Sequence, residues 1–248
     1  MAANEATSIG DGKSVLHLPG CLARLHQSLS VGERIKTRLS PRPSRAWSAQ
    51  RAVDLVVGAG FVFDGKCVLR GGRATMTLER LQSLPDSVGP GMSILIVGLN
   101  PSPYSADSGI PYGRPGNRFW PAALGAGLVS VDRDPCHALS EHGVGFTDLV
   151  RRTTRRADEV SHSEFEEGFA RVSRLVKWLK PTIVCFVGLG AWRAVVEKKA
   201  IPGLQDRWIG SSPVYVMPHT SGLNAHCRLE DLTRHFSKVR TLAKTGTG

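Results

Sequence analysis

Cysteine is scarce in this 248-residue sequence, which contains five cysteines and no closely spaced pair. An odd number of scattered cysteines is typical of free thiols in a reducing compartment rather than of a disulfide framework. The same spacing argues against a zinc site or an iron–sulfur cluster, because both need clustered thiolates. We therefore expect an intracellular protein, in the cytoplasm or nucleoid of a bacterium or in a eukaryotic nucleus or organelle, with no metal and no cofactor.

Long apolar runs are also absent. No stretch approaches the roughly 18 apolar residues of a membrane span. The segment 1–14 is polar, and the short apolar run after it is broken by Pro19, which does not fit a secretory signal. We expect no membrane association.

Phosphate-binding glycine motifs are absent as well. The apolar run 94–97 is followed by neither G-x-G-x-x-G nor G-K-[ST], so a nucleotide-binding enzyme ranks last among the alternatives.

Acidic residues are few, with 21 Asp and Glu against 32 Lys and Arg, a net charge of +11. Such an excess favours polyanionic partners, of which nucleic acid is the commonest, although a solubility charge also fits. Residues 21–52 hold seven of the basic residues and a single acid, Glu33. We predict a flexible basic arm over residues 1–52 that grips DNA through phosphates, with an organelle transit peptide as the alternative.

The rest of the chain divides into a small extension and a larger domain. Residues 53–90 are predicted to contain a β-hairpin with its turn at Asp64–Gly65, followed by a short helix at 77–84. From 91 to 244, apolar strand-like runs alternate with helical patterns, the longest of which begins at a capping box of Ser163 and Glu166. This alternation predicts an α/β fold of three layers, α/β/α, around a central, mostly parallel, twisted sheet.

Two polar loops follow predicted strands of this sheet. The first extends from the strand at 94–98 to Trp120 and begins with Asn100, and the second is the segment 217–226. In open α/β sheets, ligands bind at the edge where strands end. The two loops can therefore face each other across one cleft.

The first of these loops resembles the mismatch-specific uracil/thymine DNA glycosylases, a branch of the uracil-DNA glycosylase superfamily. The segment 144–161 resembles the central segment of that family, and the resemblance covers roughly residues 91–242. The residues that carry it in the two loops are Gly98, Asn100, Pro101, Ser105, Ala106, Pro115, Asn117, Arg118, Phe119, Trp120, Ser221, Gly222 and Leu223.

The resemblance implies that Asn100 positions the water that attacks the sugar. A side-chain amide can accept a hydrogen bond from water but is a poor base, which suits a dissociative reaction and predicts slow turnover. A turn-forming Asn before Pro101 is the structural alternative. The pocket for the flipped base is expected to contain Gly98, Leu99, Ser105, Tyr112 and Asn117, in which the Tyr112 ring stacks on the base and the small Ser105 leaves room for a thymine methyl.

The second loop is expected to contact DNA. Leu223 matches the family's apolar wedge, which fills the gap left by the flipped nucleotide, and Gly222 permits close approach of the backbone. Ser221 belongs to the same contact surface. Arg118 either reaches a phosphate or ties the loop internally.

His219 departs from the family pattern, because this branch usually has Asn at that position. Other branches of the superfamily place a His there, and an imidazole can donate a hydrogen bond to the oxyanion of the leaving base. We therefore predict a hybrid site, with Asn100 for water and His219 for the leaving group. Ala225 replaces an Arg of the family, which leaves the recognition of the opposite base undefined.

A basic cluster, Arg151, Arg152, Arg155 and Arg156, either contacts phosphates or forms a solvated charged face.

The combined prediction is a monomeric, monofunctional glycosylase that excises uracil from duplex DNA with a G·U mismatch. It needs only water, and no Lys is marked as a Schiff-base nucleophile. The alternatives are a noncatalytic nucleic-acid binder on the same fold, or a sister-branch glycosylase acting on single-stranded DNA or deaminated purines.

Overall fold

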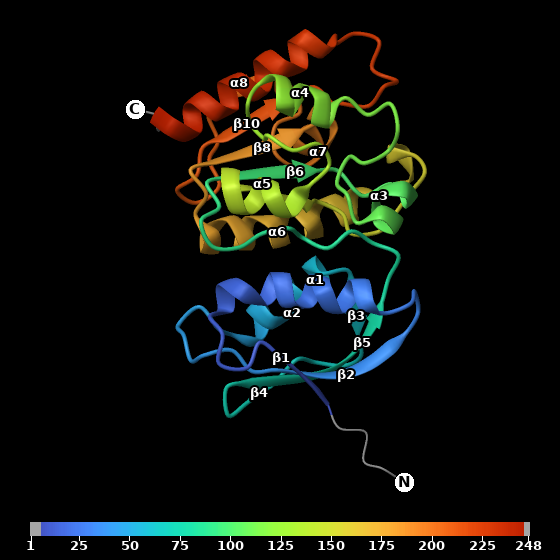
Figure 1. Ribbon diagram of the computed structural model, residues 1–248, viewed down its shortest axis with the longest axis vertical. Helices are drawn as coiled ribbons and strands as arrows, with labels where there is room; N and C mark the ends of the chain where they lie inside the picture. The colour runs from blue at the N-terminus through green and yellow to red at the C-terminus, as the bar shows by residue number, and fades with distance from the viewer. Residues whose placement is uncertain (1–5, 246–248) are drawn as a thin grey trace.

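The computed structural model describes residues 6–245, whose strands form two separate sheets (Figure 1). The first sheet belongs to the N-terminal part of the chain and has the order β1-β2-β5-β3, with β4 also paired to β5. The second has the order β7-β6-β8-β10-β9. No helix within the described residues is both long enough and apolar enough to cross a membrane.

The N-terminal domain has a core of its own. Leu18 and Leu22 of α1 and Leu55 of α2 pack with strand residues such as Leu39 and Leu78 in one buried cluster. The helices and strands around this core are β1 (Thr7–Ile9), η1 (Val15–His17), α1 (Leu18–Ser28), β2 (Arg34–Leu39), α2 (Ala49–Gly58), β3 (Phe61–Phe63), β4 (Leu69–Arg70) and β5 (Arg73–Arg80).

The prediction of a flexible arm over residues 1–52 is wrong for residues 6–52, and residues 1–5 lie outside the described part. The basic residues of β2 alternate with less exposed ones, so their charge marks one face of a strand rather than a disordered segment. Ser48 caps α2 by accepting a hydrogen bond from the Arg51 amide, and the helix continues to Gly58. One domain therefore spans both the predicted arm and most of the predicted extension.

The hairpin of the extension also differs from the prediction. Its turn is Gly71–Gly72, between β4 and β5, where both residues have positive φ (55° and 75°) and glycine is favoured. The segment from residue 77, predicted as a helix, continues strand β5 to Arg80. Pairing with both β2 and β3 decides this conformation, because a central strand gains two ladders of hydrogen bonds.

The second sheet is the centre of three layers, which confirms the predicted fold class. Four of its strands are parallel, and β9 is an antiparallel edge. Helices α4, α5 and α8 pack on one face, and α6 and α7 pack on the other. The elements are β6 (Ile94–Gly98), α3 (Pro103–Ser108), α4 (Phe119–Gly125), α5 (Pro135–His142), β7 (Val144–Asp148), η2 (Ala157–Glu159), α6 (His162–Leu179), β8 (Ile183–Val187), α7 (Leu189–Val195), β9 (Gly203–Leu204), β10 (Val214–Met217) and α8 (Leu229–Thr245).

Helix α6 begins two residues earlier than predicted. Its capping box consists of Ser161 and Glu164, because the Ser161 hydroxyl accepts from the Glu164 amide and the Glu164 carboxylate accepts from the Ser161 amide. The same Ser-x-x-Glu spacing recurs at Ser163, and sequence spacing alone does not separate the two pairs.

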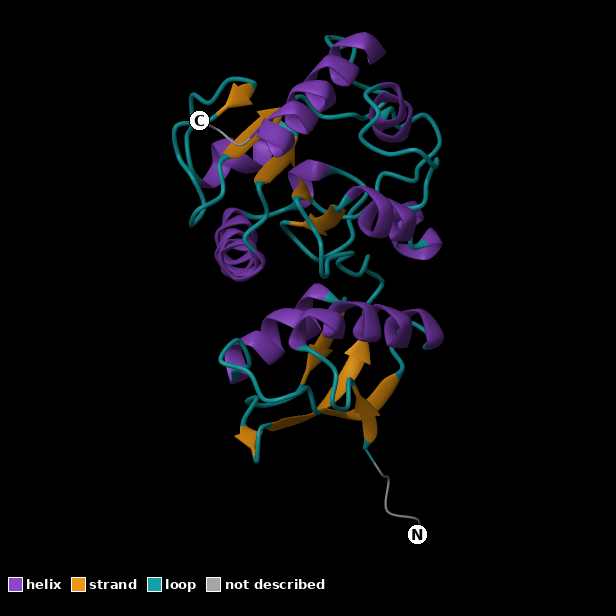
Figure 2. Ribbon diagram, turned by 60° about the vertical axis from the view of Figure 1, so that its left-hand side comes forward, coloured by secondary structure: helices purple, strands orange, loops and turns teal. Residues whose placement is uncertain are grey.

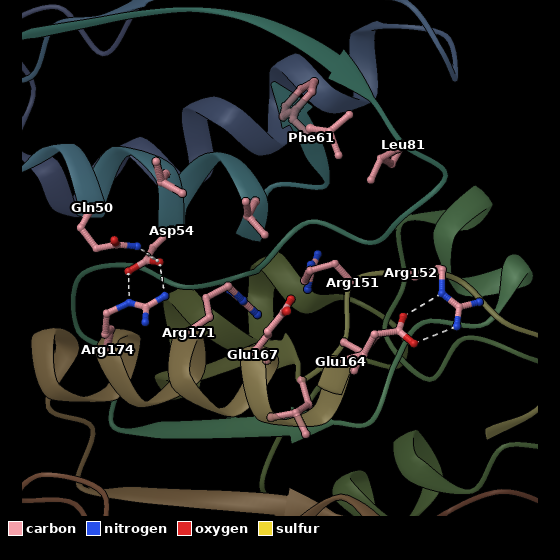
Figure 3. A pocket seen from close by; sticks show the side chains of 16 residues that line it. Gln50, Asp54, Phe61, Leu81, Arg151, Arg152, Glu164, Glu167, Arg171 and Arg174 are labelled. Carbon is pink, nitrogen blue, oxygen red and sulfur yellow. Dashed lines mark hydrogen bonds and ion pairs between the residues drawn. The ribbon is translucent and has the colours of Figure 1, made fainter. Parts of the chain in front are cut away.

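Polar contacts join the two domains. Asp54 of α2 accepts two hydrogen bonds, of 2.8 and 2.9 Å, from the guanidinium of Arg174 on α6, and Gln50 adds a third (Figure 3). The Arg51 guanidinium lies 4.2 Å from the centre of the Trp178 ring, in a cation–π contact. These contacts place the N-terminal helices against α6.

A buried ionic cluster lies where the end of α2 approaches α6 and β7. The Asp86 carboxylate accepts hydrogen bonds from Arg151 (2.9 Å), Arg171 (2.7 Å) and the Thr147 hydroxyl (2.7 Å). All four residues are more than nine-tenths buried. A Cβ at Gly58 would lie 2.3 Å from Asp86 Oδ2, so the α2 backbone approaches this cluster as closely as only glycine allows.

Candidate functional site

A cavity of about 190 Å³ opens at the carboxyl ends of β6 and β7. This volume is several times the roughly 30 Å³ share of one water molecule in the liquid, so the cavity admits a larger polar group. Six of the predicted site residues lie in its lining. The lining consists of Leu84, Leu99, Asn100, Pro101, Ser102, Ser105, Pro111, Tyr112, Arg114, Asn117, Asp148 and Ser221.

The orientation of the Asn100 side chain is fixed. Its amide nitrogen donates to the Arg152 carbonyl oxygen (3.0 Å) and to the Thr154 hydroxyl (2.7 Å), while that hydroxyl donates to the Arg156 carbonyl. Because a carbonyl oxygen can only accept, the group that faces Arg152 must be the NH2. No group in residues 6–245 donates to the Asn100 Oδ1 atom, which can therefore accept a hydrogen bond from another molecule.

Asp148, which the sequence argument did not single out, lies in the same lining. It is the last residue of β7 and pairs across the sheet with Gly98. Burial raises its carboxyl pKa to about 6, although the nearby Arg151 and Arg171 act in the opposite direction. The sequence signal that could have identified Asp148 is an acidic residue at the end of an apolar strand, where the strand meets the same sheet edge as β6.

Gly98 makes room for the Asp148 carboxyl group. A Cβ at Gly98 would lie 2.2 Å from Asp148 Oδ1 and 3.0 Å from the Tyr112 hydroxyl oxygen. Both polar groups therefore converge over the end of β6, and a side chain at Gly98 would displace them. Gly98, predicted to bind the base, is not part of the cavity lining, and its lack of a side chain instead makes room for the two groups that are.

Tyr112 is held in an unusual conformation, with a φ of 55° that few bulky residues adopt. Its ring stacks on Phe119 with 4.2 Å between ring centres and 5° between planes, so one face of the ring is covered. Its hydroxyl is buried without a hydrogen-bond partner among the described residues. Burial, and then the charge of Asp148, raise the Tyr112 pKa well above its usual value.

The other predicted pocket residues have internal contacts as well. The Ser105 hydroxyl accepts a hydrogen bond of 3.2 Å from Ser102, the N-cap of α3. Asn117 uses its side-chain oxygen to accept from the Phe119 amide (3.0 Å), which leaves its NH2 group for other partners. The Leu99 carbonyl accepts from the Val150 amide and thereby joins the two strand ends.

Arg118 ties the second loop to the first. Its guanidinium donates to the carbonyl oxygens of Cys227, Ser221 (2.9 Å) and Asn224 (2.9 Å), and its backbone amide donates to Thr220 (2.9 Å). Of the two predicted roles of Arg118, the geometry therefore favours the internal one, in which the guanidinium holds the second loop, over a contact with a DNA phosphate.

The tip of the second loop packs against the first loop. A Cβ at Gly222 would lie 2.7 Å from the Gly116 carbonyl oxygen, so the two backbones are in close contact. Leu223 next to it is 85% exposed, more than any other large apolar side chain among the described residues. The two loops face each other, as the sequence predicts, and Leu223 projects beyond them.

His219 lies beyond β10, next to Gly188 at the end of β8. A Cβ at Gly188 would be 3.5 Å from the His219 Cβ. His219 is not part of the lining of the Asn100 cavity. Burial, and then the positive charge of Arg118, lower its pKa and so favour the neutral imidazole.

The basic cluster after β7 is largely paired. Arg151 binds Asp86 in the buried cluster, Arg152 binds Glu164 (2.8 Å), and Arg156 binds Asp158 (2.5 Å). Arg155 has no side-chain partner among the described residues. Arg114, on the rim of the Asn100 cavity, is exposed and equally without a partner in the described part of the chain, so it is a more suitable phosphate contact than most of the cluster.

A second cavity, of about 390 Å³, lies between the domains (Figure 3). Side chains of α2, of α6 (Glu167 and Arg171 among them) and of the segment after β7 line it, together with Phe61 of β3 and Leu81 after β5. None of the residues predicted for catalysis or base binding borders it, although Arg151 and Arg152 of the basic cluster do. No group of three or more His, Cys, Asp or Glu side chains in residues 6–245 is placed to hold a metal ion.

Known proteins similar to this chain include one solved structure and one protein family. A candidate uracil DNA glycosylase from Methanosarcina acetivorans, solved by solution NMR, is 20% identical; the match covers 65% of this chain and 97% of that chain with a TM-score of 0.46. Residues 85–242, more than half of the chain, match the model of the uracil DNA glycosylase superfamily. On the strength of that match, this chain belongs to the uracil DNA glycosylase superfamily, whose enzymes act on DNA.

Proposed function

We propose that this protein is a monofunctional glycosylase that excises uracil from duplex DNA containing a G·U mismatch. The observation that carries the proposal is the Asn100 side chain, whose NH2 group is held by Arg152 and Thr154. Its free oxygen borders a cavity large enough for a flipped base. The superfamily supplies the class of reaction, and these contacts support a role for Asn100 in holding the attacking water.

In the proposed reaction, the bond between the sugar C1′ and the base nitrogen breaks with its electron pair on the base. Water held by Asn100 Oδ1 adds to C1′ and loses a proton, and the base leaves protonated. Asp148 would stabilise the positive charge that develops on the sugar, because its carboxylate lies in the same lining. The products are free uracil and an abasic site.

His219 is proposed to donate a hydrogen bond to the leaving base. Its position next to Gly188, at the same sheet edge, supports this role, and its lowered pKa favours an imidazole that donates one hydrogen bond. Because it does not line the cavity, it would have to reach the base in the DNA complex. His219→Ala should lower the single-turnover rate more than tenfold, and an unchanged rate would remove His219 from the site.

Four substrates test the proposed function: duplexes with G·U, G·T or A·U, and single-stranded DNA with uracil. Strand nicking after alkali reports each abasic product. We expect nicking to be fastest at G·U and absent in Asn100→Ala. Gln205→Ala, an amide substitution next to the edge strand β9, serves as the matched control and should leave the rate unchanged.

Two results would overturn the proposal. Binding of all four substrates without cleavage would favour a noncatalytic DNA-binding module. Cleavage that persists in Asn100→Ala would assign the water to another residue.

A further inference from the structure

One face of the N-terminal sheet is uncovered. Helices α1 and α2 lie on the side of the sheet that faces the second domain, and the opposite side has no element over it among the described residues (Figure 2). Side chains alternate between these two faces along each strand. Leu39, Ala74, Met76 and Leu78 face the helices and are buried in the core of the domain.

The uncovered face is strongly basic. In the register of β2 and β5, Arg34 pairs with Glu79, Lys36 with Thr77, and Arg38 with Thr75. Arg70 of β4 pairs with Arg73 of β5 at the end of the hairpin. Since directly paired residues share a face, five cations and one acid lie on this side. We call this set, Arg34, Lys36, Arg38, Arg70, Arg73, Thr75, Thr77 and Glu79, the cationic sheet face.

Most of these cations are unpaired. Arg34 binds Asp64 and lies 3.9 Å from Glu79, whereas Lys36, Arg38, Arg70 and Arg73 form no ion pair among the described residues. The neighbouring acid is Asp11, after β1. Its pKa is lowered first by a hydrogen bond from Ser8 and then by Ser40 and the charges of Arg73 and Arg38.

The charge density of duplex DNA suits this face. Alternate residues of a strand are about 6.8 Å apart, while duplex DNA carries one charge per roughly 1.7 Å of axis, so each cation can meet a phosphate. The threonine hydroxyls can also donate to phosphate oxygens. The face has no aromatic side chain within the described residues, so base stacking is not its mode of binding.

We propose that the cationic sheet face binds the phosphate backbone of duplex DNA, as a contact separate from the Asn100 cavity. The charge complementarity, and a superfamily that acts on DNA, identify the ligand. The face points away from the second domain, so the DNA that it holds is not the segment at the cavity. The contact is sequence-independent and requires no damaged base.

The test measures the affinity for an undamaged duplex of about 40 base pairs as a function of salt. Each phosphate contact contributes about 0.9 to the slope of log K against log salt concentration, so Lys36→Gln/Arg38→Gln/Arg73→Gln should reduce the slope by about 2–3. Arg38→Lys/Arg73→Lys keeps the charge and should keep the slope. Lys198→Gln/Lys199→Gln/Arg207→Gln removes three exposed charges from the second domain and should leave the slope unchanged.

A slope that does not change in the first variant, with a normal free energy of unfolding, would overturn the proposal and leave this face for an acidic protein partner. An equal loss in the second-domain control would also overturn it, because net charge alone would then explain the effect. The duplex contains no uracil, so the result does not depend on glycosylase activity. The excision rate on a G·U duplex of about 12 base pairs should be the same in all variants.

Discussion

The hydroxyl of Thr154 lies 2.7 Å from the amide nitrogen of Asn100 and donates its own proton to the Arg156 carbonyl, also at 2.7 Å. Thr154 therefore positions Asn100 without bordering the cavity itself. Thr154→Val removes this contact, and we expect the single-turnover rate to fall about tenfold, equivalent to about 1.4 kcal/mol. The measurement is excision from a G·U duplex at saturating enzyme.

Two neighbouring variants separate positioning from stability. Thr154→Ser retains the hydroxyl and should restore most of the rate. Thr153→Val removes the adjacent hydroxyl, which donates to Gln82 rather than to Asn100, and should leave the rate unchanged. Equal rates for Thr154→Val and the wild type would show that Asn100 needs no support from Thr154.

Asp148 should give the excision rate an acidic limb. With a pKa of about 6, its carboxylate is ionised above that pH and neutral below it. If the negative charge stabilises the sugar cation, the rate falls as the pH drops through about 6, and Asp148→Asn has a low rate without this limb. A pH profile of single-turnover rates checks the prediction, with the exposed Asp158→Asn as the control. A limb that persists in Asp148→Asn would contradict it.

The same residue predicts a pH dependence of stability. A carboxyl whose pKa is raised from 3.8 to about 6 stabilises the fold most in its protonated form. That contribution is present below about pH 4 and is lost as the pH rises towards 6, amounting to about 3 kcal/mol. Asp148→Asn should therefore gain stability relative to the wild type between pH 4 and pH 7. Urea denaturation at both pH values measures the difference, and a constant difference would contradict the raised pKa.

Gly98→Ala should destabilise the protein. The added methyl group would lie 2.2 Å from the Asp148 carboxylate, inside a closely packed strand end. We expect a loss of about 1–3 kcal/mol in the free energy of unfolding, together with a lower excision rate. Gly190→Ala in α7 is the control, because no atom lies within 4 Å of its added methyl group. A neutral Gly98→Ala would mean that Asp148 moves freely.

Leu223→Ala should affect binding to the duplex and not the fold. The side chain is 85% exposed, so its removal should change the free energy of unfolding by no more than about 0.5 kcal/mol. A wedge is needed only where a base must leave a stack. We expect the excision rate to fall about tenfold on G·U duplex and to stay unchanged on single-stranded uracil. Leu204→Ala, at a 48% exposed leucine of β9, is the control, and equal losses on both substrates would contradict the wedge role.

The sequence predicted the second domain well because its signals are local. Apolar runs such as Ile94–Val97 and Ile183–Val187 are buried on both sides, which only central strands of a covered sheet require. The N-terminal domain differs from the prediction because its signal lies in the alternation along a strand, not in its composition. In β2, arginine and lysine occupy the exposed face, so the composition is typical of disorder, whereas Leu39 on the other face belongs to the core.

The sequence by itself determined which polar loops follow the strands, that Asn100 begins the first of them, and that Leu223 occupies the tip of the second. Only the tertiary structure decided what these side chains contact. Arg118 and Arg151 carry the same charge in the sequence, yet one ties a loop through carbonyl oxygens and the other lies in a buried cluster with Asp86. Asp148 became part of the site only through its pairing with Gly98 across parallel strands. Such contacts join residues about fifty or more positions apart, and they are set by the pairing of parallel strands and the packing of loops in the folded second domain, not by any local pattern.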